Sequence, residues 1–224
     1  MATETNGVID TSSARQEILR WIRAANQGVA DSQPVAQQWD RIERPYRRSA
    51  TRSREEILEL LEDRLRDYDA NVVRTAEAEV AAAAAKMLAA RGHKRLLIPG
   101  GLNPAWLPAG FDYVVDDGAS PAALDGFDGV ITGSTVAIAL TGSVVLQNVP
   151  GQGRRAVSLV PDHHLCFVRV EDVVETVPEA FDRLKATSTL PTTFFAGPSA
   201  TADIEMTRIK GVHGPRFLDI ILVE

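Results

Sequence analysis

Two glycine turns with hydroxyl-bearing neighbours are the first candidates for ligand chemistry in this chain. The turns are Gly133-Ser134-Thr135 and Thr141-Gly142-Ser143, and the apolar residues 136–140 lie between them. Glycine lets the backbone turn where a Cβ would clash and lets it approach a bound group closely. Free N–H groups and hydroxyls gathered at such turns suit a carboxylate or a phosphate. All the residues of the two turns are therefore candidate ligand contacts, with two tight turns in a sheet as the alternative interpretation.

A second polar stretch, from Gly197 to Glu205, adds candidate acid–base groups. Asp203 and Glu205 stand two apart, so both point to one face if the segment is extended and diverge if it is helical. Either carboxylate can serve as a general base or accept a hydrogen bond from a ligand. Alternatively, Ser199 or Thr201 caps a helix that begins near residue 202, and Asp203 provides charge at its N-terminus. Gly197, Ser199 and Thr201 are the ligand contacts predicted here.

His213 and Arg155 complete the set of candidate residues. His213 lies in a turn-forming sequence, Gly211 to Pro215, where it can act as an acid–base group or contact a ligand, with Gly214 beside it. Arg155 can hold an anionic group through two parallel hydrogen bonds. Equally, it can form a structural ion pair at the start of a strand over residues 156–160.

Several cofactor classes are excluded for this chain. Its single cysteine, Cys166, lies in an apolar run and cannot by itself hold an iron–sulfur cluster. His163 and His164 precede the same run, and one of the two is expected to face solvent. Histidines and carboxylates show no metal-ligand spacing, so no metal site is predicted. The Gly151-Gln-Gly153 segment is not followed by a dinucleotide fingerprint.

Composition narrows the class of protein. A chain of 224 residues with 45% hydrophobic and 24% charged residues is typical of one α/β domain with a small addition. The net charge of −6 argues against a general nucleic-acid binder. No stretch has the length and low charge of a membrane-spanning helix. Residues 1–13 lack the basic start and apolar core of a secretory signal. A cytoplasmic location without membrane insertion is expected.

Residues 1–70 predict a helical N-terminal extension. The first dozen residues are polar and expected to be disordered. One helix is expected from Ser13 and another from Ser53, where Ser53-Arg-Glu-Glu56 has the pattern of a capping box. The arginine-rich stretch 41–54 between them is either a docking patch for an acidic partner or a solvated loop.

Residues 71–224 predict an α/β domain. A helix is expected over residues 75–90, because alanine is the best helix former. Short apolar runs separated by turns follow, and strands mixed with helices indicate an open, mainly parallel sheet. Hairpin-like spacing between residues 143 and 170 makes a mixed sheet the expectation. Ligands of open sheets bind beyond the carboxyl ends of the strands. The turns at Gly133 and Gly197, each after a predicted strand, are therefore expected to face one crevice.

The motifs together resemble one family. They are Ala137-Ile-Ala-Leu-Thr-Gly-Ser143, the segment from Arg155 through Pro161 to His164, Gly197-Pro-Ser199 with Asp203-Ile-Glu205, and Gly211-Val-His-Gly-Pro215. In this order they resemble the LUD domain of the lactate-utilisation LutC/YkgG proteins. The combination of the last two motifs is more specific than either alone. Residues before about 70 carry no signature of the family.

The resemblance implies a NagB/RpiA/CoA-transferase-like α/β fold, with the sheet flanked by helices. It implies a cluster-free member that takes part, with two iron–sulfur proteins, in the oxidation of L-lactate to pyruvate. Iron–sulfur clusters are then expected in the partner subunits, and no cofactor in this chain. The chain itself is expected to bind a small carboxylate, or a group of a partner, in the crevice. Asp203, Glu205 and His213 remain catalytic candidates from the motifs alone.

A free-standing small-molecule enzyme is the alternative. Proteins of that fold include sugar-phosphate isomerases, CoA transferases and folate cyclo-ligases. In that case Asp203 or Glu205 is the base, His213 assists, and the hydroxyl turns hold a phosphate or a carboxylate. Fold alone does not choose between the two functions.

Overall fold

The structure is a computed structural model that describes residues 12–25, 34–201, 209–211 and 213–224. The chain divides into two units, Met1–Tyr46 and Arg47–Glu224. The disorder expected over the first dozen residues falls outside the described residues, apart from Ser12, which begins a helix.

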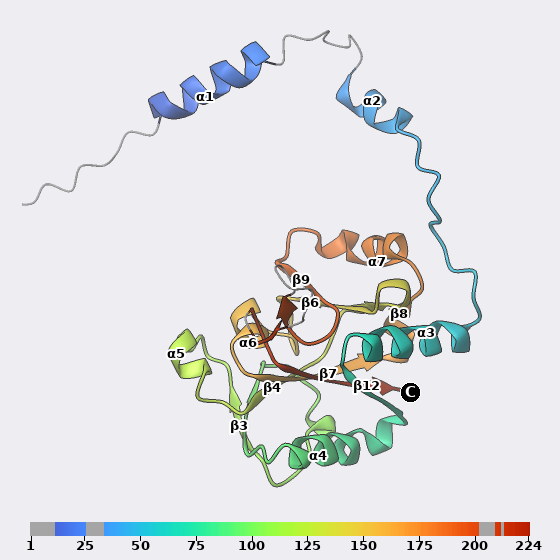
Figure 1. Cartoon of the computed structure of the whole chain (residues 1–224), viewed down its shortest axis with the longest axis vertical. Helices are drawn as coiled ribbons and strands as arrows, with labels where there is room; N and C mark the ends of the chain where they lie inside the picture. The colour runs from blue at the N-terminus through green and yellow to red at the C-terminus, as the bar shows by residue number, and fades with distance from the viewer. Residues whose placement is uncertain (1–11, 26–33, 202–208, 212) are drawn as a thin grey trace, which may run out of the picture. The chain divides into compact units, whose positions relative to one another are not determined.

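A six-stranded parallel sheet lies at the centre of the unit Arg47–Glu224 (Figure 1). Its strand order is β1-β12-β7-β4-β2-β3, and every neighbouring pair is parallel. The strands are β1 (Asn71–Thr75), β2 (Arg95–Ile98), β3 (Asp112–Val115), β4 (Gly129–Thr132), β7 (His163–Arg169) and β12 (Phe217–Val223). The central strands β7 and β12 are buried along nearly their whole length, as in sheets covered on both faces. The predicted α/β class is confirmed.

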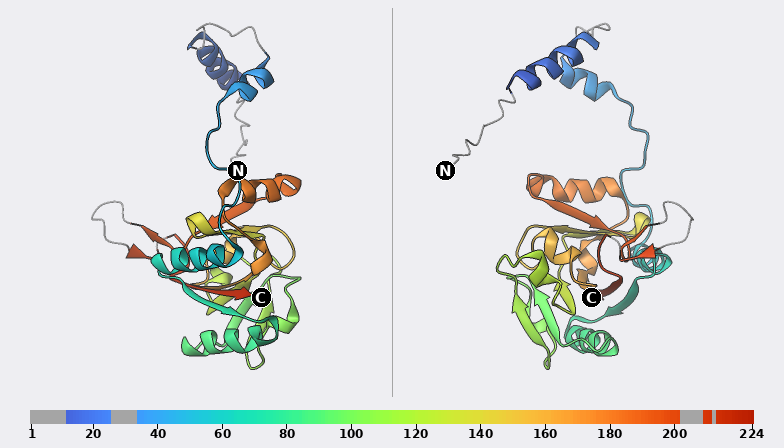
Figure 2. Two further views of the ribbon diagram at one scale, coloured as in Figure 1. Left: turned by 90° about the vertical axis from the view of Figure 1, so that its right-hand side faces the viewer. Right: turned by 60° about the vertical axis from the view of Figure 1, so that its left-hand side comes forward.

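A second sheet packs over one face of the first (Figure 2). Its order is β8-β5-β6-β9, with β6 antiparallel to both neighbours and β5 parallel to β8. These strands are β5 (Val136–Ile138), β6 (Ser143–Gln147), β8 (Val173–Val174) and β9 (Thr192–Phe195). Two further strands, β10 (Ala200–Thr201) and β11 (Ile209–Lys210), pair with each other. A mixed sheet is therefore present beside the parallel one, but the hairpin expected between residues 143 and 170 is not. The strand β6 pairs with β5 and β9, and β7 belongs to the parallel sheet.

Helices cover both faces of the parallel sheet, because apolar side chains alternate between its two sides. The α-helices of this unit are α3 (Arg54–Asp67), α4 (Val80–Ala90), α5 (Pro121–Leu124), α6 (Arg155–Leu159) and α7 (Val177–Leu184). Its short 3₁₀ helices are η1 (Glu77–Glu79), η2 (Pro104–Trp106), η3 (Ala139–Thr141), η4 (Val170–Asp172) and η5 (Lys185–Thr187). The α4 helix packs on one face, beside Leu165 and Phe167 of β7. The α3 helix and the second sheet pack on the other, beside Cys166 and Val168.

The α3 helix is an integral part of this unit, although the sequence analysis grouped it with the N-terminal extension. The predicted capping box is confirmed: Ser53 N–H donates to Glu56 Oε2 at 2.8 Å, and Ser53 Oγ accepts from Glu56 N–H at 3.4 Å. Four side chains of α3 are buried in the core shared with β12 and the second sheet, namely Ile57, Leu58, Leu61 and Leu65. The boundary predicted near residue 70 stays a proposal, and it can be tested by truncation.

Part of the arginine-rich stretch is bound to a buried carboxylate. Glu175 is fully buried, and it accepts hydrogen bonds from the backbone N–H groups of Thr51 and Arg52. The guanidinium groups of Arg47 and Arg52 pair with it as well. Burial would raise the pKa of Glu175, but these donors outweigh it and lower the pKa to about 2. Residues 47–52 are therefore bound to this unit. Neither interpretation of the arginine-rich stretch, a docking patch or a solvated loop, describes these residues.

Two predicted elements differ in the structure. The segment 156–160 was expected to be a strand, but residues 155–159 form the helix α6. A short apolar run does not distinguish a strand from a buried helical turn. The helix expected from residue 75 begins at Val80, because residues 71–75 form β1 beside β12.

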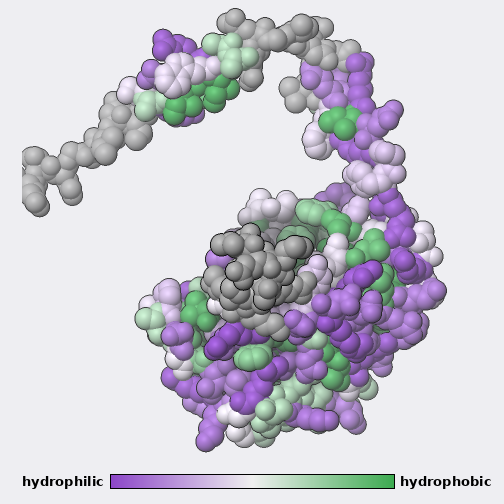
Figure 3. All heavy atoms as spheres, in the orientation of Figure 1, coloured by the Kyte–Doolittle hydropathy of each residue, from purple (hydrophilic) through white to green (hydrophobic). Residues whose placement is uncertain are grey.

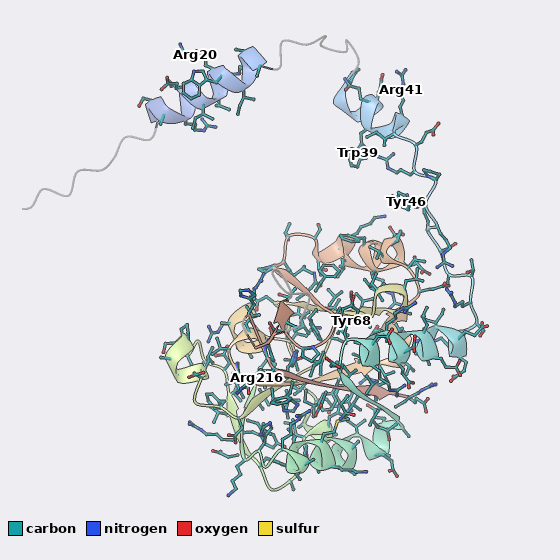
Figure 4. The ribbon with its side chains drawn as sticks, in the orientation of Figure 1. Arg20, Trp39, Arg41, Tyr46, Tyr68 and Arg216 are labelled. Carbon is teal, nitrogen blue, oxygen red and sulfur yellow. The ribbon has the colours of Figure 1, made fainter. Side chains whose placement is uncertain are left out.

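The unit Met1–Tyr46 contains the helices α1 (Ser12–Ala25) and α2 (Val35–Arg41). Hydrophobic side chains of α1 gather on one side of the helix (Figure 3), and Ile18, Trp21 and Ile22 are exposed. Figure 4 labels Arg20 on α1 and Trp39 on α2. The Arg44 guanidinium lies 4.7 Å from the centre of the Trp39 ring and donates to the Trp39 carbonyl at 2.9 Å.

Candidate functional site

The candidate residues lie at opposite ends of the parallel sheet. One cavity, of about 320 Å³, lies at the amino ends of β7 and β12, and we call it the amino-end cavity. Another, of about 250 Å³, lies at the carboxyl ends of β2, β4 and β7, and we call it the carboxyl-end cavity. The single crevice predicted from the sequence is wrong. Gly197 follows β9, which belongs to the second sheet, so the rule for parallel strands does not place it beside Gly133.

The amino-end cavity gathers motif residues that are distant in the sequence. The predicted site residues that line it are Arg155, Gly197, Ser199, His213 and Gly214. Its other lining residues are Ser158, Leu159, His164, Thr193, Phe194, Phe195, Ala196, Pro198, Ala200, Pro215 and Leu218. These come from α6, β7, β9, β12 and the turns before β10 and β12. Of the candidates in this part of the sequence, Asp203 and Glu205 lie outside the described residues, as does the side chain of Thr201.

Backbone hydrogen bonds hold the two turns of this cavity together. Ser199 N–H donates to the Pro215 carbonyl at 2.8 Å, and Gly211 N–H donates to the Ser199 carbonyl at 2.9 Å. His213 N–H donates to Ser199 Oγ at 3.2 Å. The Ser199 hydroxyl therefore positions the exposed His213 at the cavity wall, and its own O–H remains able to donate.

Both glycines of this wall make close backbone contacts. Gly197 has a φ of +98°, and a Cβ there would lie 2.6 Å from Tyr68 Cβ. Figure 4 shows Tyr68 at the carboxyl end of α3. A Cβ on Gly214 would lie 3.2 Å from Ser199 Cβ. Gly197 and Gly214 therefore let the backbone pack closely, and neither has a side chain to bind a ligand.

His164 forms a buried, neutral wall of the cavity. Its Nε2 lies 2.8 Å from Thr132 Oγ1, and its ring lies 5.1 Å from that of Phe195. Burial, with a contribution from His163, lowers the pKa of His164 to about 3. The ring therefore carries no charge at neutral pH. The expectation that one of the two adjacent histidines faces solvent is wrong, since both are buried.

His163 lies on the opposite face of the sheet, because neighbouring residues of a strand alternate. Its Nε2 lies 3.1 Å from Asp219 Oδ2, and Arg91 donates to Asp219 Oδ1 at 2.8 Å. Burial would raise the pKa of Asp219, but His163 and Arg91 outweigh it and hold the pKa below its usual range. This buried group belongs to the packing against α4 and not to the cavity.

Arg155 is the positively charged side chain of the amino-end cavity. It is exposed at the start of α6 and forms no hydrogen bond or ion pair with the described residues. The preceding Arg154 makes the structural ion pair instead, with Nε and Nη2 each 2.8 Å from a carboxylate oxygen of Asp116. A neighbouring hollow of about 290 Å³ shares Arg155, Ser158 and Thr193 with the cavity. Arg155 is thus available to an anion from either side.

The carboxyl-end cavity contains Gly133 and Ser134 among its lining residues. Gly133 N–H donates to the Gly151 carbonyl at 2.7 Å, and Ser134 Oγ donates to the Phe167 carbonyl at 3.0 Å. Thr135 Oγ1 donates to Gln152 Oε1 at 2.8 Å. The groups that the sequence analysis assigned to a ligand are therefore used within the protein here.

The second hydroxyl turn lies in a third place, against α3. Gly142 has a φ of +62°, and a Cβ there would lie 2.7 Å from Arg64 Cβ. Thr141 Oγ1 donates to Ser143 Oγ at 2.9 Å. Neither cavity is lined by Thr141, Gly142 or Ser143. The tight-turn interpretation fits this turn.

Sequence reasoning missed Gln152, which is buried beside the carboxyl-end cavity. The available signal in the sequence was a glutamine between two glycines. In the structure, Gly151 and Gly153 both have a positive φ, so the turn holds Gln152 in a fixed backbone conformation. From the sequence, this Gly-Gln-Gly segment indicates only that a dinucleotide fingerprint is lacking. Thr132 was also missed, because nothing in a four-residue strand marks the one hydroxyl that meets His164.

Cys166 does not provide redox or metal chemistry in this arrangement. It is fully buried, and burial raises the pKa of its thiol to about 12. Among the residues that the structure describes, no three His, Cys, Asp or Glu side chains are grouped so as to hold a metal ion. No helix within the described ranges is both long and apolar enough to cross a membrane.

Comparisons with known proteins give the following matches. The family model described as LUD domain matches residues 122–223. Lactate utilization protein C of Deinococcus radiodurans is 41% identical over 216 residues, which cover 95% of this chain and 97% of the relative. Lactate utilization protein C 1 of Bacillus mycoides is 38% identical over 100 residues, 42% of either chain. The crystal structure of a DUF162 family protein from Deinococcus radiodurans matches with a TM-score of 0.69 and 40% identity, covering 78% of this chain and 100% of that one.

Proposed function

The chain belongs to the LUD-domain family, and from this premise we propose that it is a non-redox component of lactate utilisation. The family resemblance drawn from the motifs is confirmed by the match along nearly the whole of a lactate utilization protein C. In the proposal, iron–sulfur partner proteins oxidise L-lactate to pyruvate. The clusters are assigned to those partners because the only thiol of this chain, Cys166, is buried and one thiolate cannot hold a cluster.

We assign the binding of a small carboxylate, or of a carboxylate-bearing partner group, to the amino-end cavity. The observation that carries this assignment is Arg155, an unpartnered guanidinium among the described residues, which lines the cavity together with the motif residues Ser199 and His213. A guanidinium binds a carboxylate through two parallel hydrogen bonds. The Ser199 hydroxyl can donate a further hydrogen bond, and the neutral ring of His164 adds no competing charge.

The size of the cavity fits this ligand class. Its volume of about 320 Å³ corresponds to roughly ten water molecules in the liquid. Lactate or pyruvate, each with six heavy atoms, fits with room for ordered water. Catalytic roles for Asp203, Glu205 and His213 remain part of the proposal, with the carboxylates as bases and His213 as an acid–base group.

Anaerobic reconstitution tests this function. Candidate iron–sulfur partners are assayed for L-lactate-dependent dye reduction, with and without this chain. We expect turnover to require the chain and Arg155→Gln to raise the half-saturating lactate concentration about tenfold or more, because one charged hydrogen-bonded contact is lost. The matched control is Lys86→Gln, which also removes one positive charge but lies on α4, across the sheet from the cavity.

Two outcomes would contradict the proposal. If the partner proteins oxidise lactate fully without this chain, it is not a component of that reaction, and the free-standing enzyme becomes the better account. If Arg155→Gln and Lys86→Gln behave alike in a reaction that needs the chain, the carboxylate is bound elsewhere. Thermal melting of both variants separates loss of binding from loss of folding.

A further inference from the structure

The strand β9 is an edge strand with one side open. It is the last strand of the second sheet, and β6 is the described strand that pairs with it. Asn148 N–H donates to the Pro191 carbonyl at 3.3 Å, so the odd-numbered residues of β9 direct their backbone groups to β6. The N–H and C=O groups of Thr192 and Phe194 therefore face away from β6. Within the described part of the chain, these four groups have no hydrogen-bond partner.

The sequence of β9 does not protect this open edge. The strand reads Thr192-Thr-Phe-Phe195, without a charged residue or a proline, and the Phe194 side chain is 44% exposed. Edge strands of natural proteins usually carry charges or prolines, because a bare edge pairs with other chains. The edge strands of the parallel sheet carry such charges, with Arg74 in β1 and Asp112 in β3. The open edge of β9 therefore has the character of a binding surface.

A groove follows this edge, and we call it the edge groove. One half is the amino-end cavity, lined by residues 193–195 of β9, and the other is the neighbouring hollow, lined by residues 192 and 193. Successive side chains of a strand point to opposite faces, so a hollow that touches successive residues follows the edge of the strand. Arg155 and Ser158 of α6 also line both halves. The edge groove is therefore bounded by an open strand edge and by a helix that carries a cation.

The position of Arg155 indicates the charge of the occupant. Its guanidinium forms no ion pair with the residues that the structure describes, and it lines the groove where the two halves meet, as Thr193 does. A carboxylate bound to it therefore belongs near the middle of an extended ligand. Two copies of this chain joined through their β9 edges would bring two Arg155 side chains into one groove, and this like-charge contact opposes self-association.

We propose that the open edge of β9 binds an extended segment of a partner protein with an acidic side chain near its middle. The segment pairs as an added strand with the backbone groups of Thr192 and Phe194, and its carboxylate binds Arg155. In this mode the main-chain hydrogen bonds provide affinity, and the side chains provide specificity. The proposal deepens the proposed function and rests on it for the carboxylate at Arg155. Of the two ligands left open there, it selects the partner group.

The test uses the peptide acetyl-Thr-Val-Glu-Val-Thr-amide and ¹⁵N NMR of the full-length chain. We expect saturable shifts of the Thr192 and Phe194 amide resonances, because their N–H groups bond to the added strand. A peptide with Gln in place of Glu should bind about tenfold more weakly, and Arg155→Gln should bind both peptides equally weakly. A peptide that is N-methylated at its central residues should not bind. Unshifted amide resonances at millimolar peptide would overturn the added strand, and equal affinity of the wild-type chain for both peptides would overturn the acidic specificity.

Phe194→Pro removes one outward N–H but none of the backbone bonds to β6, and proline is tolerated at such edge positions. Phe194→Val is the matched control, because it also removes the ring but keeps the donor. We expect at least tenfold weaker peptide binding by Phe194→Pro than by Phe194→Val, and equal binding by the two variants would overturn the proposal. If Phe194→Pro does not fold, the N-methylated peptide decides.

Two further measurements separate this proposal from its alternatives. In the lactate reconstitution, Phe194→Pro should raise severalfold the concentration of the chain needed for half-maximal turnover. If Phe194→Pro has no effect there and Arg155→Gln raises only the half-saturating lactate concentration, the proposed function stands with a small carboxylate as ligand and the added strand is overturned. If the peptide binds as expected but lactate oxidation does not need the chain, the edge site stands and the proposed function fails. A dimer in sedimentation that Phe194→Pro dissociates would make the edge an interface between copies and overturn the proposal.

Discussion

The two ends of the parallel sheet use the same kinds of residues in different ways. At the carboxyl end, the hydroxyls of Ser134 and Thr135 bond to the protein itself. At the amino end, a turn hydroxyl and an exposed guanidinium line the cavity together. Glycines and hydroxyls therefore do not identify a ligand site by their presence. What identifies it is a polar atom that the fold orients but does not pair.

The two cavities also depend on different parts of the fold. The carboxyl-end cavity rests on turns that directly follow strands of the parallel sheet. The amino-end cavity needs the second sheet, through β9, and the end of α3, through the contact of Gly197 with Tyr68. Damage to α3 or its contacts should therefore act first on the amino-end cavity.

The largest expected effect comes from truncation. A chain that begins at Arg47 should keep both cavities, because it retains the complete second unit. A chain that begins at Asn71 loses Ile57, Leu58, Leu61 and Leu65 from the core. At about 2 kcal/mol for each buried side chain, the loss is of the order of the whole stability of a domain. Circular dichroism and urea unfolding measure both truncations, and a folded, cooperative 71–224 fragment would support the domain boundary predicted near residue 70.

A smaller effect is expected from single glycine substitutions. Gly197→Ala forces a Cβ into Tyr68 and a side chain into a positive φ. Unfolding free energy should fall by about 3 kcal/mol, from strain and overpacking together. Gly133→Ala is the matched control at the other cavity, since its nearest new contact is 3.6 Å away and its φ is not positive. Urea denaturation compares the two, and equal losses would mean that the α3 contact does not support the amino-end cavity.

The sequence was sufficient for the parts of this fold that depend on local pattern. The capping box at Ser53 and the α/β class follow from short-range rules. That Arg155 joins Ser199 and His213 in one cavity was not predicted, because their separation in the chain gives no local signal. Register and sheet membership were not predictable, and these decide which turns meet.

The errors have a common physical origin. Gly133 and Gly197 each follow a strand, but only the structure shows that the strands belong to different sheets. Arg154 and Arg155 are two neighbouring arginines in the sequence, but Arg154 is the extended N-cap of α6 and pairs with Asp116, whereas Arg155 is the first residue of the helix and lines the cavity. Packing of the whole unit decides where such side chains lie, and a short stretch of sequence does not contain that information.

The pH dependence of stability should show that the His164 ring in the wall of the amino-end cavity is buried and neutral. Burial lowers the pKa of His164 to about 3, so the unfolded chain binds a proton below about pH 6.5 while the folded chain does not. Stability should therefore fall as pH drops from about 6.5 toward 3, by at most about 1.4 kcal/mol per pH unit from this group. His164→Gln keeps a hydrogen-bond partner for Thr132 Oγ1 and removes the ionisable imidazole. Urea unfolding at neutral and mildly acidic pH should show a shallower decline in the variant, and equal declines would mean that His164 titrates normally.

The smallest expected effect is the response of ligand binding to salt. Arg155 is exposed, so its attraction for a carboxylate is screened as ionic strength rises and the Debye length falls from about 10 Å at 0.1 M toward about 3 Å at 1 M. At the carboxyl end, by contrast, the charged side chains are already paired within the protein, Arg169 with Glu77 and Asp172 with Arg183. A severalfold loss of carboxylate affinity is therefore expected at the amino-end cavity as salt is added. Acetate titrations of the wild-type chain and of Arg155→Gln, each with sodium chloride added, measure this response. If salt changes the affinity of the two proteins equally, the carboxylate is not bound through Arg155, and the contrast between an unpaired cation at one end and paired charges at the other would not explain binding.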